Sequence, residues 1–230
     1  MVARDVPPGH RADDVYLPTT IARVVAIDVA TPRGLARARI LPAEAPIGGL
    51  VLGHGAGGGV DAPDLAAAAG AAVEAGFSVA LVEQPYRVVG RRSPPPGGHL
   101  DEAWTAVLAR LAGDQLSGLP LVVGGRSSGA RVACRTAAAC AARGVLCLAF
   151  PLQPPRREER PPAPSRLGEL DAVPVPTLVV QGASDPFGMP PGGVHRTVVV
   201  VAGDHSLRGA SSAVAAAVLA WLPSLVPSRQ

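Results

Sequence analysis

The chain is organised around the stretch Leu121-Val122-Val123-Gly124-Gly125-Arg126-Ser127-Ser128-Gly129-Ala130-Arg131-Val132-Ala133. An apolar β-branched run ends at paired glycines, a serine lies within the pattern G-x-S-x-G, and an alanine-rich segment of helical character follows directly. This order predicts a strand, a sharp turn and a helix, with Ser127 in a strained backbone conformation on the turn. Gly125 and Gly129 would let the strand and the helix approach closely, so that the serine hydroxyl projects beyond the sheet. A glycine-rich chain also produces this short pattern by chance, so the flanking sequence has to decide.

The length of 230 residues suits one well-buried α/β domain and is short for two. Hydrophobic residues make up 48% of the chain and aromatic residues only 3%, so Val, Leu and Ala must build the core. Residues 1–20 are interpreted as a flexible N-terminal arm and residues 21–230 as a single domain. Within that domain, residues 151–165 are rich in proline and arginine and are expected to form an exposed loop.

A net charge of +3 and a pI near 9.1 raise the hypothesis of nucleic-acid binding. The basic residues are all arginine, however, and they are spread along the chain. In the richest run, residues 156–160, they are interleaved with glutamates. We therefore expect no nucleic-acid partner, since no groove-reading module accompanies the charge.

The three cysteines predict neither a disulfide framework nor a metal site. Cys134 and Cys140 fall on different faces of one expected helix, and Cys147 lies in an expected buried strand. The N-terminal residues show no apolar signal segment, and the apolar segment 213–226 is too short to span a membrane. We expect a cytoplasmic protein without a membrane partner, and the sequence leaves a homodimer open.

Hydrophobic patterning predicts a series of strands separated by turns. The first two are expected to form an antiparallel hairpin at a sheet edge, and the later apolar runs are typical of strands buried on both faces. The strands are expected at residues 21–29, 35–41, 47–52, 77–82, 119–123, 145–150, 177–181 and 197–202.

Helical segments alternate with these strands. Asp61 is expected to cap the first helix, with Pro63 in its first turn, and Gly144 is expected to end the helix that follows Ser127. The helices are expected at residues 65–75, 100–111, 128–143, 166–170 and 211–222. The alternation predicts an α/β fold with a mostly parallel sheet and helices on both faces. In such sheets the reactive surface lies at the carboxyl ends of the strands.

Ser127, Asp185 and His205 each follow an expected parallel strand, so we expect them to meet at one edge of the sheet. A serine hydroxyl is a weak nucleophile until an imidazole takes its proton, and the imidazole needs a carboxylate to hold its tautomer. Asp204 is an alternative acid. As the direct neighbour of His205 in an extended segment, it would point away from the imidazole.

The glycine-rich loop 53–59 is expected at the same edge. His54 in this loop suits a role in shaping the loop better than one as the base. A tetrahedral intermediate needs hydrogen-bond donors for its oxyanion. The candidates are the backbone N–H of Ser128 and that of Ala56 or Gly57.

A dinucleotide site is the competing interpretation of this loop. Gly53, Gly55 and Gly58 match G-x-G-x-x-G after a strand, and Glu83 ends the next strand where a ribose-binding acid would stand. Against it, the helix is expected to begin at about Asp61, beyond the last glycine, whereas a pyrophosphate must reach the helix N-terminus.

Several short stretches between about residues 47 and 222 together carry a family resemblance. They are His54-Gly55-Ala56-Gly57, Gln84-Pro85-Tyr86 with Gly90-Arg91-Arg92, residues 124–132, Gln181-Gly182 with Asp185-Pro186-Phe187-Gly188, and Gly203-Asp204-His205-Ser206-Leu207. With them the chain resembles the α/β-hydrolase superfamily. Within it, the chain is similar to small bacterial dienelactone-hydrolase-like proteins related to the hydrolase-like domain of nonspecific-lethal complex subunit 3 and to testis-expressed hydrolase-like proteins. The resemblance implies Ser127 as nucleophile, Asp185 as acid and His205 as base.

Two departures from the family pattern concern the substrate. Arg126 stands where many relatives have lysine, and the acidic loop 60–63 differs from their usual form. The candidates for substrate binding are His54, Tyr86, Arg87 and Arg126. An acidic group of the substrate would be recognised by Arg87, Arg91, Arg92 or Arg126. Most of these arginines are nevertheless expected to be solvated or paired with a nearby glutamate, Glu83.

These observations predict a serine hydrolase that cleaves a carboxylic ester or thioester through an acyl-enzyme, without cofactor or metal. The segment after Phe150 is too short for a helical lid, which indicates an open cleft and a modest or soluble small-molecule acyl substrate. The alternatives are a non-catalytic interaction module of the same fold and, third, a dinucleotide-binding protein.

Overall fold

A computed structural model describes residues 24–154 and 163–226 of the chain. The predicted N-terminal arm and the central part of the predicted exposed loop, residues 155–162, lie outside the described residues. In the described flanks of that loop, residues 151–154 and 163–166, the chain forms neither helix nor strand.

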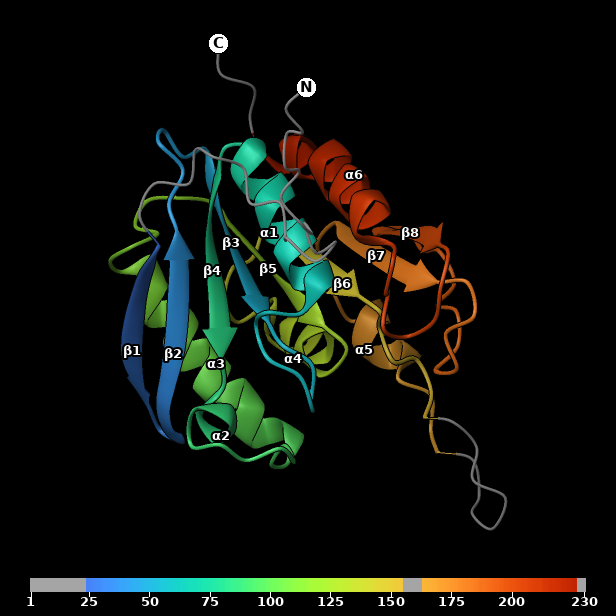
Figure 1. Cartoon of the computed structure of the whole chain (residues 1–230), viewed down its shortest axis with the longest axis horizontal. Coiled ribbons are helices and arrows are strands. Elements are labelled where there is room, and N and C mark those ends of the chain that lie inside the picture. The colour runs from blue at the N-terminus through green and yellow to red at the C-terminus, as the bar shows by residue number, and fades with distance from the viewer. Residues whose placement is uncertain (1–23, 155–162, 227–230) are drawn as a thin grey trace, which may run out of the picture.

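Eight strands form one sheet in the order β1-β2-β4-β3-β5-β6-β7-β8 (Figure 1). Strand β2 runs antiparallel to both of its neighbours, and the other neighbouring strands pair in parallel. The mostly parallel sheet and the hairpin of β1 and β2 at its edge are therefore confirmed. The strands are β1 Val25–Thr31, β2 Gly34–Leu41, β3 Gly48–Gly53, β4 Phe77–Glu83, β5 Leu121–Arg126, β6 Gly144–Leu148, β7 Thr177–Gly182 and β8 Arg196–Val201.

Helices cover both faces of the sheet, as predicted (Figure 1). On one face, α1 and α6 pack against each other and against a cluster that includes Leu65 and Val218. On the other face, α3 and α4 enclose a second cluster around Trp104 and Leu111. The helices are α1 Pro63–Glu74, α2 Pro85–Val88, α3 Gly97–Ala112, α4 Ser128–Thr136, α5 Leu167–Asp171 and α6 Ser211–Trp221, followed by the 3-10 helix η1 Leu222–Leu225.

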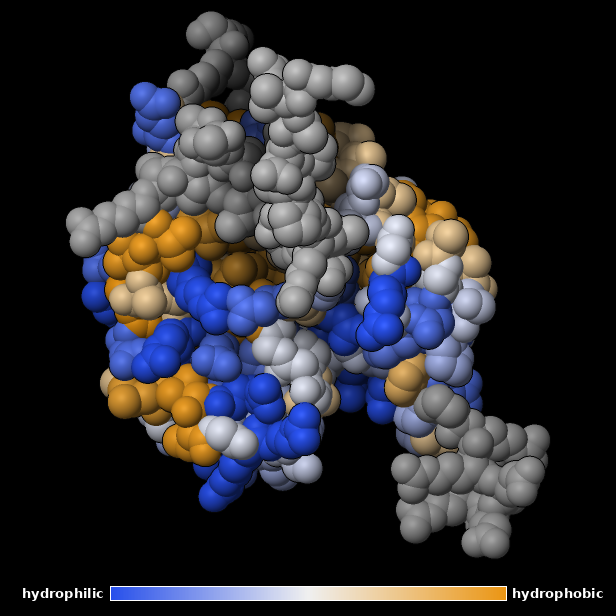
Figure 2. All heavy atoms as spheres, in the orientation of Figure 1, coloured by the Kyte–Doolittle hydropathy of each residue, from blue (hydrophilic) through white to orange (hydrophobic). Residues whose placement is uncertain are grey.

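The central strands β3, β6 and β7 are buried along their whole length, which explains why they read as continuous apolar runs rather than as alternating ones. Each fully buried Leu or Val contributes about 1.5–3 kcal/mol relative to an exposed position. The surface seen in Figure 2 carries hydrophilic and hydrophobic residues side by side. Because the central strands are buried in this way, the strand ends lie on a well-packed support.

The N-terminus of α1 differs from the prediction in one respect. Pro63 is the first helical residue as expected, but the N-cap position is Ala62, whose side chain makes no capping hydrogen bond. Asp61 instead forms an exposed ion pair with Arg39 of β2. The predicted cap was wrong because Arg39 of β2, which is distant in sequence, binds the same carboxylate.

The helix after Ser127 is also shorter than predicted. It ends at Thr136 rather than Arg143, and Gly144 is the first residue of β6 rather than a helix terminator. The chain turns through Ala141, whose φ is 51°, and the Arg143 N–H then donates to the carbonyl of Leu121. An alanine-rich run carries no local stop signal, so tertiary pairing with β5 sets the boundary.

The long loop after β4 is more regular than predicted. It contains the short helix α2, and α3 begins at Gly97 instead of Leu100. Two glycines open α3, which is the reason its first turn escaped detection, since glycine is a poor helix former. The predicted apolar side of α3 is confirmed, because Ala103, Val107 and Leu111 are buried.

The thiols of Cys134 and Cys147 are both free and buried, with their sulfurs 3.5 Å apart. Among residues 24–154 and 163–226, no cluster of three or more His, Cys, Asp or Glu side chains could hold a metal ion. Over the same ranges, none of the helices combines the length and apolar character that a membrane-spanning helix requires.

Candidate active site

The turn at Ser127 joins the end of β5 to the start of α4. Its φ of 52° and ψ of −107° lie in the strained region that the sequence predicts. A Cβ at Gly125 would lie 2.9 Å from the carbonyl carbon of Gly129 and still closer to the carbonyl oxygen of Gly53 in β3. Only glycine fits there, so both flanking glycines allow the close approach that presents the serine at the sheet edge.

Ser127, His205 and Asp185 lie in one hydrogen-bonded chain. The Nε2 atom of His205 is 2.9 Å from Ser127 Oγ, and its Nδ1 atom is 2.8 Å from Asp185 Oδ2. A carboxylate only accepts hydrogen bonds, so Nδ1 donates to Asp185 and Nε2 is left to accept the hydroxyl proton of Ser127. The structure therefore brings together the three residues that the sequence places after β5, β7 and β8.

The side chain of Gln181 in β7 holds Asp185 in place through a hydrogen bond. Gln181 is fully buried in β7, and its Nε2 group donates to Asp185 Oδ2 at 2.8 Å. Its Oε1 atom accepts a hydrogen bond from the Phe150 N–H at 2.8 Å, which fixes the orientation of the amide. The second carboxylate oxygen of Asp185 accepts the N–H of Phe187 at 2.9 Å. Sequence reasoning missed this role, although a glutamine inside an apolar strand signals a buried polar group that needs partners.

The segment that carries His205 excludes Asp204 as the acid. Asp204 Oδ1 accepts hydrogen bonds from both the N–H and the hydroxyl of Ser206, at 2.8 and 2.6 Å. These bonds lower the pKa of Asp204 and keep its carboxylate within a local turn. The imidazole of His205 also packs against the ring of Phe187, with 4.3 Å between the two ring centroids.

His54 shapes the glycine-rich loop, and its assignment to substrate binding is corrected. Its Nδ1 group donates to the carbonyl of Gly55 at 2.8 Å, and its Nε2 atom accepts the N–H of Gln84 at 3.0 Å. Burial lowers the pKa of His54, which agrees with a neutral ring in this arrangement. Both nitrogens are engaged within the protein, so neither is left for a substrate.

Tyr86 has a similar supporting role. Its hydroxyl donates to the carbonyl of Ala56 at 2.7 Å, and burial raises its pKa to about 12. Although most of the side chain is buried, Tyr86 lines a cavity of about 450 Å³, so its assignment to substrate binding stays a prediction. His54 and Tyr86 therefore hold the adjacent carbonyls of Gly55 and Ala56, in the loop that carries the candidate oxyanion donors.

The candidate oxyanion donors lie beside the serine. Ser128 is the first residue of α4, where a backbone N–H has no acceptor within the helix. The loop with Ala56 and Gly57 borders the same site, because a Cβ at Gly55 would lie 3.7 Å from Ser127 Cβ. The arrangement can supply N–H groups from two directions to an oxygen next to Ser127 Oγ.

The arginines near the site differ from expectation. Arg126 forms an ion pair with the buried Asp64 of α1, with Nε 2.8 Å from Oδ2, and is not free to bind an acidic substrate. Arg87 donates to the carbonyl of Arg91 at 3.2 Å. Among the described residues, no ion pair joins an arginine to Glu83, whereas Arg91 and Arg92 are exposed to solvent, which is the other expected outcome.

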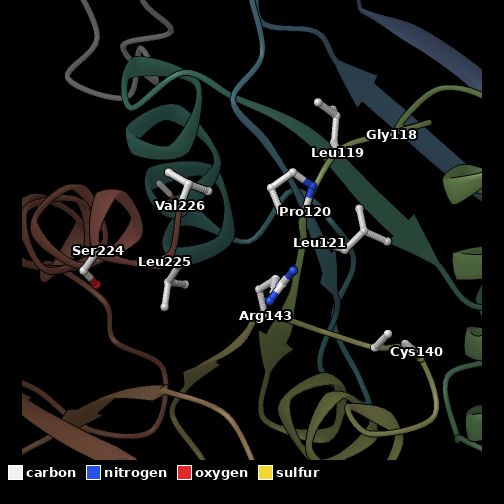
Figure 3. Close-up of a pocket in the computed structure, with 10 residues that line it drawn as sticks. Gly118, Leu119, Pro120, Leu121, Cys140, Arg143, Ser224, Leu225 and Val226 are labelled. Carbon is white, nitrogen blue, oxygen red and sulfur yellow. The ribbon is translucent and has the colours of Figure 1, made fainter. Parts of the chain in front are cut away.

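A cavity of about 830 Å³ lies at the opposite edge of the sheet (Figure 3). It is lined by Leu121 at the start of β5, by Arg143 just before β6, and by Leu225 of η1. Since Ser127 follows the other end of β5, this cavity is separate from the hydrogen-bonded chain of Ser127, His205 and Asp185.

Comparisons with known proteins agree with this architecture. The sequence profile of a family described as an alpha/beta hydrolase domain matches residues 47–216. An α/β serine hydrolase without lid from Xanthomonas campestris is 19% identical, with a TM-score of 0.70 over 93% of this chain and 100% of that one. A dienelactone hydrolase from Anabaena variabilis is 17% identical, with a TM-score of 0.69 over 89% of this chain and 99% of that one. An esterase from Pyrobaculum calidifontis is 19% identical, with a TM-score of 0.62 over 87% and 85%. Comparison with curated proteins gives no match.

Proposed function

The chain belongs to the α/β-hydrolase family, and from this premise we propose that it is a serine hydrolase that cleaves a carboxylic ester or thioester of a small molecule. The observation that carries the proposal is the continuous hydrogen-bonded chain from Asp185 through His205 to Ser127. Nucleophile, base and orienting acid within hydrogen-bond reach of one another are the arrangement that activates a serine.

In the acylation step, Ser127 Oγ attacks the carbonyl carbon of the substrate while His205 Nε2 takes the hydroxyl proton. The carbonyl oxygen becomes an oxyanion, which the N–H of Ser128 and that of Ala56 or Gly57 stabilise. Collapse of this intermediate breaks the bond to the alcohol or thiol, which leaves with the proton from His205. The product of this step is an acyl-enzyme at Ser127.

In the deacylation step, water attacks the acyl-enzyme and gives a proton to His205. The second tetrahedral intermediate releases the carboxylic acid and returns the proton to Ser127. Asp185 stays ionised throughout and stabilises the imidazolium that forms in both steps. Neither step changes an oxidation state, so the reaction consumes only the substrate and water.

The competing dinucleotide interpretation fits the geometry less well. Helix α1 begins at Pro63, several residues beyond Gly58, so the glycines do not lead a phosphate to the helix N-terminus. Asp64 is buried in the first turn of that helix, where its carboxylate would repel an anion. A rise in melting temperature with NAD or NADP, absent with plain phosphate, would reverse this ranking.

The proposal is tested by turnover of a matched panel of p-nitrophenyl esters and acyl thioesters of two to eight acyl carbons. We expect hydrolysis that falls by about 10⁴- to 10⁶-fold in Ser127→Ala, because the oxyanion donors and binding alone remain. Ser224→Ala is the control, since that hydroxyl makes an exposed bond to the carbonyl of Trp221, away from the site. Absence of turnover by the folded wild type across the panel would favour a non-catalytic interaction module.

A further inference from the structure

The guanidinium of Arg126 joins three segments that meet at the site. Its Nε atom forms an ion pair with Asp64 Oδ2 of α1 at 2.8 Å, and its Nη2 group donates to the carbonyl oxygen of His205 at 2.9 Å. A Cβ at Gly55 would lie 3.0 Å from Arg126 Nη1, so the guanidinium also packs against the glycine-rich loop. Arg126 directly precedes Ser127, and it therefore connects the serine turn to the backbone of the base.

The carboxylate of Asp64 is unusually deeply buried. Its side chain is 1% exposed and that of Arg126 is 18% exposed. Burial raises the pKa of Asp64, and the positive charge of Arg126 opposes this shift. Ion pairs this deeply buried add little net stability, because desolvation offsets the attraction. The pair is thus poorly explained as a device for stability, and its position next to His205 suggests a geometric role.

The segment around His205 needs such a contact. Gly203 has a φ of 110° and Leu207 a φ of 50°, so the backbone on both sides of His205 is in the left-handed region. Asp204 and Ser206 bond to each other within the segment, and the side chain of Leu207 is buried. Among the described residues, the bond from Arg126 ties the carbonyl of His205 to the segment that bears the serine.

We propose that Arg126 and Asp64 form a clamp that positions His205 against Ser127. Arg126 orients the backbone of the base, and Asp64 orients Arg126. Both are positioning residues, since neither contacts the reacting atoms. The effect on rate rests on the proposed hydrolase function, whereas the effect on the order of the segment 203–209 does not.

The test compares Arg126→Gln, Arg126→Lys and Asp64→Asn with the control Asp61→Asn. Asp61 lies three residues before Asp64 and also pairs with an arginine, but its side chain is 76% exposed. We expect Arg126→Gln and Asp64→Asn to lower kcat by about 100-fold, as displaced catalytic groups do, with KM changed less than about threefold. Arg126→Lys keeps one of the two polar contacts, so its kcat should lie between that of wild type and that of Arg126→Gln. Asp61→Asn should behave as wild type.

Amide hydrogen exchange supplies a readout that does not depend on turnover. The clamp predicts faster exchange across residues 203–209 in Arg126→Gln and Asp64→Asn, with exchange in β3 and β5 unchanged. Wild-type exchange in this segment together with wild-type kcat would overturn the clamp. A wild type that neither turns over esters nor reacts with a fluorophosphonate would overturn the hydrolase proposal alone. Should Arg126→Gln and Asp64→Asn fail to fold, Arg126→Lys decides, and wild-type kcat and exchange in it would count against the clamp.

Discussion

Gln181 is the residue through which the buried end of β7 controls the acid of the site. Gln181→Leu keeps the volume but removes the donor to Asp185 Oδ2 and leaves the Phe150 N–H without its acceptor. We expect a loss of about 1–3 kcal/mol in the free energy of unfolding from the unpaired buried groups. We also expect a fall in kcat of about tenfold or more, because Asp185 gains rotational freedom.

This prediction is checked by urea unfolding and steady-state kinetics on the same preparation. Gln115→Leu is the matched control, since the Gln115 amide makes exposed hydrogen bonds before the start of β5, whereas Ser127 follows the other end of that strand. A Gln181→Leu protein with wild-type kcat would show that Asp185 is oriented by His205 and Phe187 without help from β7.

Tyr86 gives a prediction about pH. Burial raises its pKa to about 12, whereas an unfolded tyrosine titrates near 10. The folded state therefore favours the neutral phenol, and the resulting stability is present below about pH 10 and is lost as the pH rises toward 12. Tyr86→Phe lacks this group, so its free energy of unfolding should fall less than that of wild type between pH 9 and 11. Parallel curves for the two proteins would contradict the burial-raised pKa of Tyr86.

For individual residues, the sequence predicts those that directly follow strands. It misses residues whose role depends on hydrogen bonds to side chains or backbone on other elements. Ser127, Asp185 and His205 were predicted because the carboxyl ends of parallel strands share one edge. The roles of Arg126 and Gln181 depend on partners on other elements, and no spacing along the chain encodes those contacts. The same holds for Tyr86 and His54, whose hydrogen bonds to the carbonyls of Ala56 and Gly55 depend on the folded loop.

At the scale of elements, the turn between β5 and α4 depends on two glycines that face Gly53 of β3. Gly125→Ala or Gly129→Ala would place a methyl group against backbone atoms that cannot move independently. We expect each change to cost about 1–3 kcal/mol in the free energy of unfolding and to lower activity, because overpacking displaces the turn. Gly70→Ala in α1 is the control, since nothing lies within 4 Å of its Cβ position. That helical change should stabilise the protein by about 0.5–1 kcal/mol, and an equal effect at all three sites would contradict the account.

Element types were predicted more reliably than element ends. The central strands β3, β6 and β7 were recognised because they are continuous apolar runs buried on both faces. The end of α4 at Thr136 and the start of α3 at Gly97 were not, because backbone pairing and packing set them against the local helix propensity. The unpredicted helix α2 likewise begins at Pro85, where proline is favoured in a first turn.

At the scale of the whole molecule, the alternation of strands and helices was sufficient to predict the sheet, its covered faces and the edge that carries the site. The family match over residues 47–216 supports the same architecture. The relation to the nonspecific-lethal complex subunit stays a prediction. The identity of the acyl and leaving groups does not follow from the fold, because the serine turn determines how a nucleophile is presented and not what it attacks.

The central claim is that Ser127 is a nucleophile activated by His205 and Asp185. Its most direct test is the mass of the intact protein after reaction with a fluorophosphonate, followed by peptide mapping of the adduct. We predict one adduct per chain, located on Ser127. It should be absent in Ser127→Ala, and its formation should be strongly slowed in His205→Ala. Wild-type protein that is folded and yet carries no adduct, or carries it equally in Ser127→Ala, would contradict the account.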